Sequence, residues 1–274
     1  MGGIRLKLCG GTTRTGDRPK RHVNIPLFDQ LSRQDLDAVA RGSARAGAAW
    51  KPARRIGLRG WLIKGLLGAA WLVCATPFAW DSERMTAAAV VMGPRAAAGV
   101  RDLQSLLTMA LDFDDTGRLG AINQFFNRRI IFAEDVQNWN QVDYWASPLE
   151  LLAKGAGDCE DYVIAKYFSL VVAGVPSARL RLVYVRLQIG GPRGIVQPHM
   201  VLAYYASANA EPLILDNLVN DIKPASRRLD LVPVFSFNGE GLWQGVDGPV
   251  VPDSIARLSR WRAVLAKAKA EGFH

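Results

Sequence analysis

The pattern of hydrophobic and polar positions divides the chain into a helical part and a later part rich in strands. Between residues 94 and 127, apolar side chains recur at helical spacing, with a break at residues 114–117. The members of the two apolar faces are Leu103, Leu106, Leu107 and Leu111, then Leu119, Ile122, Phe125 and Phe126. Residues 135–145 read as a loop that carries Trp139, Tyr144 and Trp145. Ser147 then predicts a short helix, because Pro148 follows at its first position and Glu150 at its third.

A second, largely buried helix is predicted to start after Gly155-Ala156-Gly157 and to end near Gly174. Its stripe at helical spacing is Val163, Lys166, Tyr167 and Leu170, in which only the aliphatic stem of Lys166 interrupts the apolar character. Asp158 occupies the N-cap position, and Asp161 three residues later resembles a capping box with Asp in place of Glu. Beyond Gly174 the period changes, predicting strands at residues 180–189, 200–206, 212–216 and around 232–237, and a basic helix over 253–270. Helices followed by antiparallel strands predict an α+β fold.

The N-terminal quarter of the chain has a different character. Residues 1–50 are rich in Gly, Arg, Ala and Thr, and we expect either disorder or a true translation start further downstream. Residues 51–75 predict a signal peptide, in which arginines precede an apolar run that ends at Val73-Cys74-Ala75. An uncleaved anchor and a buried helix are the alternatives. We therefore expect residues 76–274 to form one exported, periplasmic domain without stable membrane insertion.

The net charge of +9 lies entirely in this N-terminal quarter. Residues 1–75 hold 14 Lys and Arg against 4 Asp and Glu, which leaves 20 against 21 for residues 76–274. Because the body of the chain carries no excess of positive charge, we expect no nucleic-acid partner.

Two features indicate a functional role for Cys159: it would be the one cysteine left after cleavage, and it lies at a predicted helix start. The chain has three cysteines, Cys9, Cys74 and Cys159, and cleavage after Ala75 would leave only the last. A lone thiol in an oxidising compartment is either buried and inert or reactive. The first turn of a helix favours a thiolate, so its position and polar neighbours indicate a nucleophile.

A thiolate nucleophile needs a base and a group that orients the base. His199 opens a predicted strand and Asp216 closes the next one, so the two meet if these strands are hairpin neighbours. Taken singly, His199 is consistent with a structural histidine and Asp216 with a turn residue. The order Cys, His, Asp on helix, strand and neighbouring strand indicates a catalytic triad.

These segments resemble one family, the bacterial transglutaminase-like cysteine proteinases, which include the LapG-type periplasmic adhesin proteases. The resemblance covers about residues 95–245. It rests on the motif from Asp143-Tyr144-Trp145 through Ser147-Pro148 to Gly157-Asp158-Cys159-Glu160-Asp161-Tyr162, then on Pro198-His199-Met200 and Leu215-Asp216-Asn217. It implies a papain-like transglutaminase core, with the nucleophile helix packed on an antiparallel sheet and Cys159, His199 and Asp216 as the triad.

The resemblance further implies that Asp158, Glu160 and Asp161 bind Ca²⁺, with Asp143 and Glu134 as further candidates. A physical argument points the same way, since a carboxylate about 5 Å from the thiol opposes its ionisation by on the order of 3 kcal/mol. A bound cation would neutralise that charge. The alternative is that Asp158 and Asp161 only cap the helix and Glu160 is solvated. Trp145 either lines the site or belongs to the core.

The function implied by the resemblance is a periplasmic, calcium-dependent cysteine endopeptidase that controls biofilm attachment. Its substrate would be a large surface adhesin, cut near the N-terminus. Its regulator would be an inner-membrane cyclic di-GMP receptor that sequesters it. Two alternatives remain open from the sequence: amide transfer to an amine by the same core, and a catalytically silent binding module of the same fold.

Overall fold

The computed structural model describes residues 80–191, 193–246, 248 and 258–274. The predicted disordered segment 1–50 and the predicted signal peptide 51–75 lie outside the described residues, so both stay predictions. Within the described part of the chain, no helix combines the length and the apolar character needed to cross a membrane.

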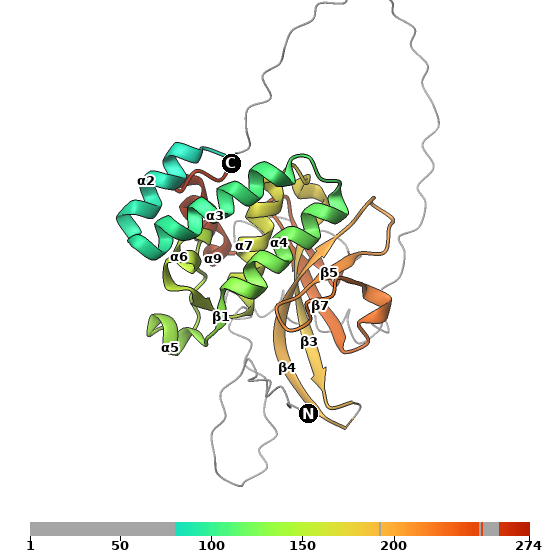
Figure 1. Ribbon diagram of the computed structural model, residues 1–274. Helices are drawn as coiled ribbons and strands as arrows, with labels where there is room; N and C mark the ends of the chain where they lie inside the picture. The colour runs from blue at the N-terminus through green and yellow to red at the C-terminus, as the bar shows by residue number, and fades with distance from the viewer. Residues whose placement is uncertain (1–79, 192, 247, 249–257) are drawn as a thin grey trace, which may run out of the picture.

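Helices gather on one side of the molecule and strands on the other (Figure 1). The helical layer comprises α2 (Ser82–Met92), α3 (Pro94–Ala110), α4 (Asp115–Arg129), α5 (Asp135–Trp139), α6 (Pro148–Lys154), α7 (Cys159–Val172) and α9 (Ser259–Ala270). The predicted break at residues 114–117 is the start of α4, because the side chain of Asp114 accepts a hydrogen bond from the Gly117 N–H at 2.7 Å. Leu111 follows the end of α3 and is exposed, so its assignment to the apolar face was wrong.

The motif at Ser147 forms the predicted capping box. The Ser147 side chain accepts from the Glu150 N–H, and the Glu150 side chain accepts from the Ser147 N–H. By contrast, the stretch read as a loop contains the short helix α5, which five residues are too few to reveal by periodicity.

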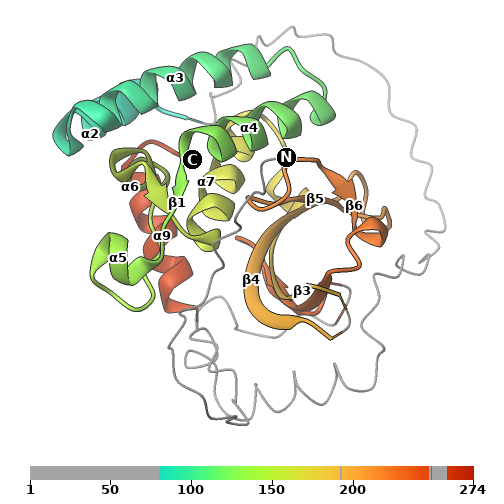
Figure 2. The same cartoon turned by 60° about the horizontal axis from the view of Figure 1, so that its bottom comes forward.

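The sheet has six antiparallel strands in the order β6-β5-β4-β3-β7-β8. Its strands are β3 (Leu180–Ile189), β4 (Ile195–Tyr204), β5 (Leu213–Leu215), β6 (Lys223–Pro224), β7 (Leu231–Phe237) and β8 (Leu242–Gln244). The four predicted strands are all present. β4 begins at Ile195 instead of residue 200, because its pairing with β3 continues along the whole hairpin. The long β3–β4 hairpin curves strongly, as Figure 2 shows.

Helix α7 lies between the other helices and the sheet, and it packs against α4, α6, β3 and β4. All but two of its residues are buried, which agrees with the predicted buried helix. The strands alternate between two apolar clusters: Leu182 and Tyr184 face the helices, whereas Val183 and Val185 belong to a separate cluster. The result is a two-layer α+β fold in which α7, whose first residue is Cys159, packs against the sheet.

The C-terminal helix α9 is an integral part of the helical layer. Trp261 is fully buried and packs against Tyr167 and Phe168 of α7 at ring-centroid distances of 5.5 and 5.7 Å. Phe273 then pairs with Trp80, and Gly272 accepts a hydrogen bond from the Asp81 N–H at 2.8 Å. The helix begins at Ser259 in the structure, while residues 253–257 of the predicted helix lie outside the described residues.

Candidate active site

Cys159 is the first residue of α7 and is 4% exposed. Asp158 occupies the N-cap position as predicted, but its side chain makes no capping hydrogen bond to the helix. The Cys159 thiol donates a hydrogen bond to the carboxylate of Glu160, with Sγ 2.8 Å from Oε2. A carboxylate in this position interacts better with the neutral thiol than with a thiolate.

His199 and Asp216 are brought together as the sequence predicts. Nε2 of His199 lies 2.8 Å from Oδ1 of Asp216, and both side chains are fully buried. His199 stands on β4, the strand against which α7 packs, so His199 and Cys159 belong to two elements in direct contact. Asp216 follows β5, which is the hairpin neighbour of β4. The strand pairing inferred from the chain order is therefore correct.

Asp216 is held on both carboxylate oxygens and on its backbone. Oδ1 also accepts from the Leu218 N–H at 3.0 Å, and Oδ2 accepts from Nη2 of Arg228 at 2.8 Å. Asn127 of α4 donates to the backbone carbonyl at 2.8 Å. Burial alone would raise the pKa of Asp216, but His199, Arg228 and the Leu218 N–H outweigh it and hold this pKa well below its usual range. Asp216 is thus a permanent anion suited to orient an imidazole.

Three carboxylates beside the nucleophile form one compact cluster. Asp135, Asp158 and Asp161 each place an oxygen within 4.8 Å of the others. Two of the three predicted calcium ligands, Asp158 and Asp161, belong to it, while the third, Glu160, lies next to it and contacts the thiol. Asp135 was not predicted. It follows β1 (Ile131–Phe132), which pairs in parallel with β2 (Ala156–Gly157) directly before the nucleophile.

The residues of this cluster fit a cation. Oδ1 of Asp135 and Oδ2 of Asp161 are buried and have no hydrogen-bond partner among the described residues. Burial, with a smaller contribution from neighbouring carboxylates, raises the pKa of Asp135 to about 7 and the pKa of Asp161 above its usual range. Buried carboxylate oxygens that lack donors and repel one another are typical of an oxygen-lined site for Ca²⁺.

Gly157 makes this arrangement possible. A Cβ at this position would lie 2.6 Å from the Asp161 carboxylate and 2.6 Å from the Leu151 side chain. Asp161 itself is anchored by the Ala146 N–H, which donates to Oδ1 at 2.8 Å. The Gly before the Asp-Cys pair is therefore required for space around the carboxylate cluster.

The two further calcium candidates, Asp143 and Glu134, are not members of the carboxylate cluster. Asp143 forms an ion pair with Arg260 of α9 at 2.9 Å, and Glu134 is the N-cap residue of α5. Burial raises the pKa of Asp143 to about 6, although Arg260 and a hydrogen bond from Trp145 oppose this shift. Trp145 is buried and stacks on Phe237 at 5.8 Å, which places it in the core.

Two buried basic side chains lie close enough to Asp216 to act on it, which the sequence did not indicate. Lys166, on α7, is fully buried, and its Nζ has no hydrogen-bond partner among the described residues. Burial lowers its pKa to about 7, and Asp216 opposes this shift. Arg228 is 3% exposed and contacts Asp216 directly, but its segment matches no motif.

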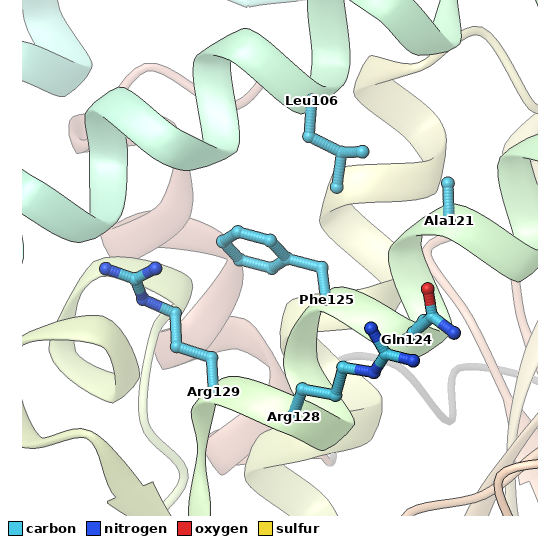
Figure 3. Close-up of a pocket in the computed structure, with 6 residues that line it drawn as sticks. All are labelled: Leu106, Ala121, Gln124, Phe125, Arg128 and Arg129. Atoms are coloured by element: carbon cyan, nitrogen blue, oxygen red, sulfur yellow. The ribbon is translucent and has the colours of Figure 1, made fainter.

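A surface pocket of about 470 Å³ lies elsewhere, between α3 and α4 (Figure 3). It is lined by Leu106, Ala121, Gln124, Phe125, Arg128 and Arg129, with Leu106 and Phe125 pointing toward each other. None of these side chains belongs to the triad or to the carboxylate cluster, so this pocket is separate from the candidate active site.

A cysteine at the start of a buried helix, with a His–Asp pair on the adjoining sheet, defines a transglutaminase-like cysteine protease. The sequence comparison agrees, because the family of bacterial transglutaminase-like cysteine proteinases matches residues 98–232. The chain belongs to this family, as its similarity to solved structures also shows.

Three of these structures are of LapG from Legionella pneumophila. One is 34% identical, covers 69% of this chain and 97% of its own, and superposes with a TM-score of 0.59. A calcium-bound form is 34% identical, covers 68% and 98%, and has a TM-score of 0.57. An EGTA-treated form is 36% identical, with a TM-score of 0.60. Among curated proteins, none matches the chain.

Proposed function

We propose that this protein is a calcium-dependent cysteine endopeptidase with Cys159 as nucleophile, His199 as base and Asp216 as the group that orients the base. The observation that carries the proposal is the buried 2.8 Å contact between His199 and Asp216, on strands next to the helix that Cys159 begins. Because Nε2 of His199 is engaged by Asp216, Nδ1 is the nitrogen left to exchange a proton with the thiol.

In the proposed reaction, His199 takes the thiol proton, and Sγ of Cys159 attacks the scissile carbonyl carbon. The carbonyl π electrons move to oxygen, where the backbone N–H of Cys159 at the helix start supplies one donor. The C–N bond then breaks, and the leaving amine takes the proton from the imidazolium. Water, deprotonated by His199, attacks the thioester, and the C–S bond breaks to release the carboxylic acid and the thiol.

Asp135, Asp158 and Asp161, with Glu160 next to them, would hold the calcium ion. A bound Ca²⁺ would neutralise the negative charge around the thiol. Support comes from the two buried carboxylate oxygens that lack donors, and from the calcium-bound form of the Legionella protein. In the proposed reaction the carboxylate of Glu160 must release the thiol before attack.

The proposed substrate is a large surface adhesin cut near its N-terminus, and the proposed regulator is an inner-membrane cyclic di-GMP receptor. Both come from the family resemblance, as does a periplasmic location after removal of the signal peptide. N-terminal sequencing of the protein recovered from the periplasm tests export, with an expected start near Thr76. An intact segment 1–75 on that protein would overturn the proposed processing.

The activity is tested by expressing wild type and Cys159→Ala in a strain that lacks the native enzyme. We expect the wild type to release a large surface protein into the medium, shortened at its N-terminus, and the variant to leave it on the cells. Ser169→Ala, a small-residue change further along the same helix, is the matched control. Equal release by wild type and Cys159→Ala would refute the proposed function.

A further inference from the structure

Arg228 is buried and contacts Asp216, the third residue of the proposed triad. Its side chain is 3% exposed and lies between two carboxylates. Nη2 is 2.8 Å from Oδ2 of Asp216 and also 2.8 Å from Oδ2 of Asp230, while Nε is 2.9 Å from Oδ1 of Asp230. The proposed reaction uses only the other oxygen of Asp216, so Arg228 holds the oxygen that His199 does not touch.

A carboxylate needs two anchors to keep a fixed plane, because the terminal torsion of an Asp side chain is broad and nearly two-fold. In Asp216, His199 and the Leu218 N–H hold Oδ1, and Arg228 holds Oδ2. Without the guanidinium, rotation about the last bond of Asp216 would turn Oδ1 out of line with Nε2 of His199. The planar guanidinium also donates in fixed directions, which a lysine ammonium does not.

We propose that Arg228 is a positioning residue for the protease, which fixes the orientation and tautomer of the His199 imidazole by locking the carboxylate plane of Asp216. This inference rests on the proposed triad. Asp230 in turn anchors Arg228, because it accepts hydrogen bonds from two nitrogens of the guanidinium. The Asp230 side chain is 36% exposed. The chain of contacts therefore runs from the buried imidazole to the surface.

The pKa of His199 distinguishes two roles of Arg228: orienting Asp216, or acting only as a nearby positive charge. The two roles predict shifts of opposite sign when Arg228 is removed. If Arg228 positions Asp216, its removal misaligns the anion that stabilises the imidazolium, and the pKa of His199 falls. If Arg228 acts only as a nearby positive charge, its removal relieves repulsion of the imidazolium, and the pKa of His199 rises. Lys166, the other buried cation whose charge acts on Asp216, is kept in every variant.

The experiment uses the full chain and the variants Arg228→Gln, Arg228→Lys and Asp230→Asn. Arg129→Gln, which loses a 2.6 Å ion pair with Asp102 away from the triad, is the matched control. The pKa of His199 is followed by NMR of labelled histidine, with its signals identified from His199→Asn. Alkylation of Cys159 by iodoacetamide is followed against pH by peptide mass spectrometry.

For Arg228→Gln we expect the His199 pKa to fall by about one unit and Cys159 alkylation near neutral pH to slow by about tenfold. Arg228→Lys should recover part of both losses, and Asp230→Asn should shift both in the same direction by less. A His199 pKa that rises, or that stays at the wild-type value in folded Arg228→Gln, would overturn the positioning role. If Arg228→Gln fails to fold, unchanged values in both Asp230→Asn and Arg228→Lys would overturn it equally.

The two proposals fail in distinguishable ways. If His199→Asn leaves the pH profile of Cys159 alkylation unchanged, the nucleophile–base pair itself is refuted. If His199→Asn changes the profile and Arg228→Gln does not, the triad stands and only the role of Arg228 is lost.

Discussion

The hydroxyl of Ser147 donates a hydrogen bond to the carboxylate of Glu271, 124 residues further along the chain. Glu271 also accepts from the Leu149 N–H at 3.3 Å, so the C-cap residue of α9 binds one backbone N–H at the start of α6. The segment that precedes the nucleophile is therefore held by the C-terminal end of the fold.

This contact predicts a pH-dependent stability. Burial raises the pKa of Glu271 from 4.5 to about 7, against the hydrogen bonds from Ser147 and Leu149. Between pH 4.5 and 7 the folded state therefore binds more protons than the unfolded state. The stability that protonated Glu271 contributes is complete below pH 4.5 and is lost as pH rises to 7. Glu271→Gln should match the wild type at pH 4.5 and be more stable at pH 8, by about 3 kcal/mol at most. Urea unfolding at both pH values measures the difference, with exposed Glu83→Gln as control; equal pH slopes for wild type and Glu271→Gln would disprove it.

Lys166 predicts that the free energy of unfolding rises with pH above neutrality, opposite to the effect of Glu271. Its folded-state pKa of about 7 lies below the unfolded value of 10.5, so the unfolded state binds more protons between them and stability rises over this range. Lys166→Met should remove that rise and stabilise the protein at pH 7 by on the order of 4 kcal/mol. Thermal unfolding at pH 7 and 10 checks this, with exposed Lys269→Met as control. A Lys166→Met protein that is less stable than wild type at pH 7 would contradict the prediction.

The triad predicts strongly non-additive losses of activity. Cys159→Ala and His199→Ala should each abolish cleavage, and the double variant should be no worse, because the members act as a unit. Asp216→Asn should lower kcat by about 10⁴-fold, because the amide favours the wrong tautomer of His199. Circular dichroism confirms that each variant is folded. Near wild-type cleavage by Cys159→Ala would rule out the nucleophile.

Calcium dependence should follow the carboxylate cluster. EGTA should abolish cleavage, and Ca²⁺ should restore it better than Mg²⁺, which demands a rigid octahedral shell. Asp135→Asn and Asp158→Asn should weaken Ca²⁺ binding, measured directly by calorimetry, and reduce activity in parallel. Asp112→Asn, an acid outside the cluster, is the control. Calcium binding that survives both cluster changes would place the ion elsewhere.

Much of the fold follows from local pattern. The capping box at Ser147, the start of α7 and the four main strands are set by residues close in sequence, so the sequence predicts them. The order of Cys159, His199 and Asp216 also predicts the His–Asp contact, since hairpin neighbours meet at a known edge. The catalytic roles of Cys159, His199 and Asp216 stay predictions, as do the roles of Asp158, Glu160 and Asp161 as calcium ligands.

The residues that sequence reasoning missed act across long separations. Asp135 reaches the cluster because β1 pairs with β2, and two-residue strands have no periodicity to detect. Arg228 is an ordinary Arg in a turn until the fold encloses it with Asp216. The expected cap at Asp158 failed for a related reason: its carboxylate joins a cluster with Asp135 and Asp161, which only the folded chain assembles.

The closure of the fold by its C-terminal residues has a consequence for the timing of activity. During translation α7 and Cys159 leave the ribosome well before Trp261, which fills the core, and Glu271, which caps α6. A nascent chain that has made the nucleophile still lacks these two contacts and the pairing of Trp80 with Phe273. We therefore expect no activity from a chain that has not yet added residues 261–273, because the helical layer that holds Cys159 is incomplete without them.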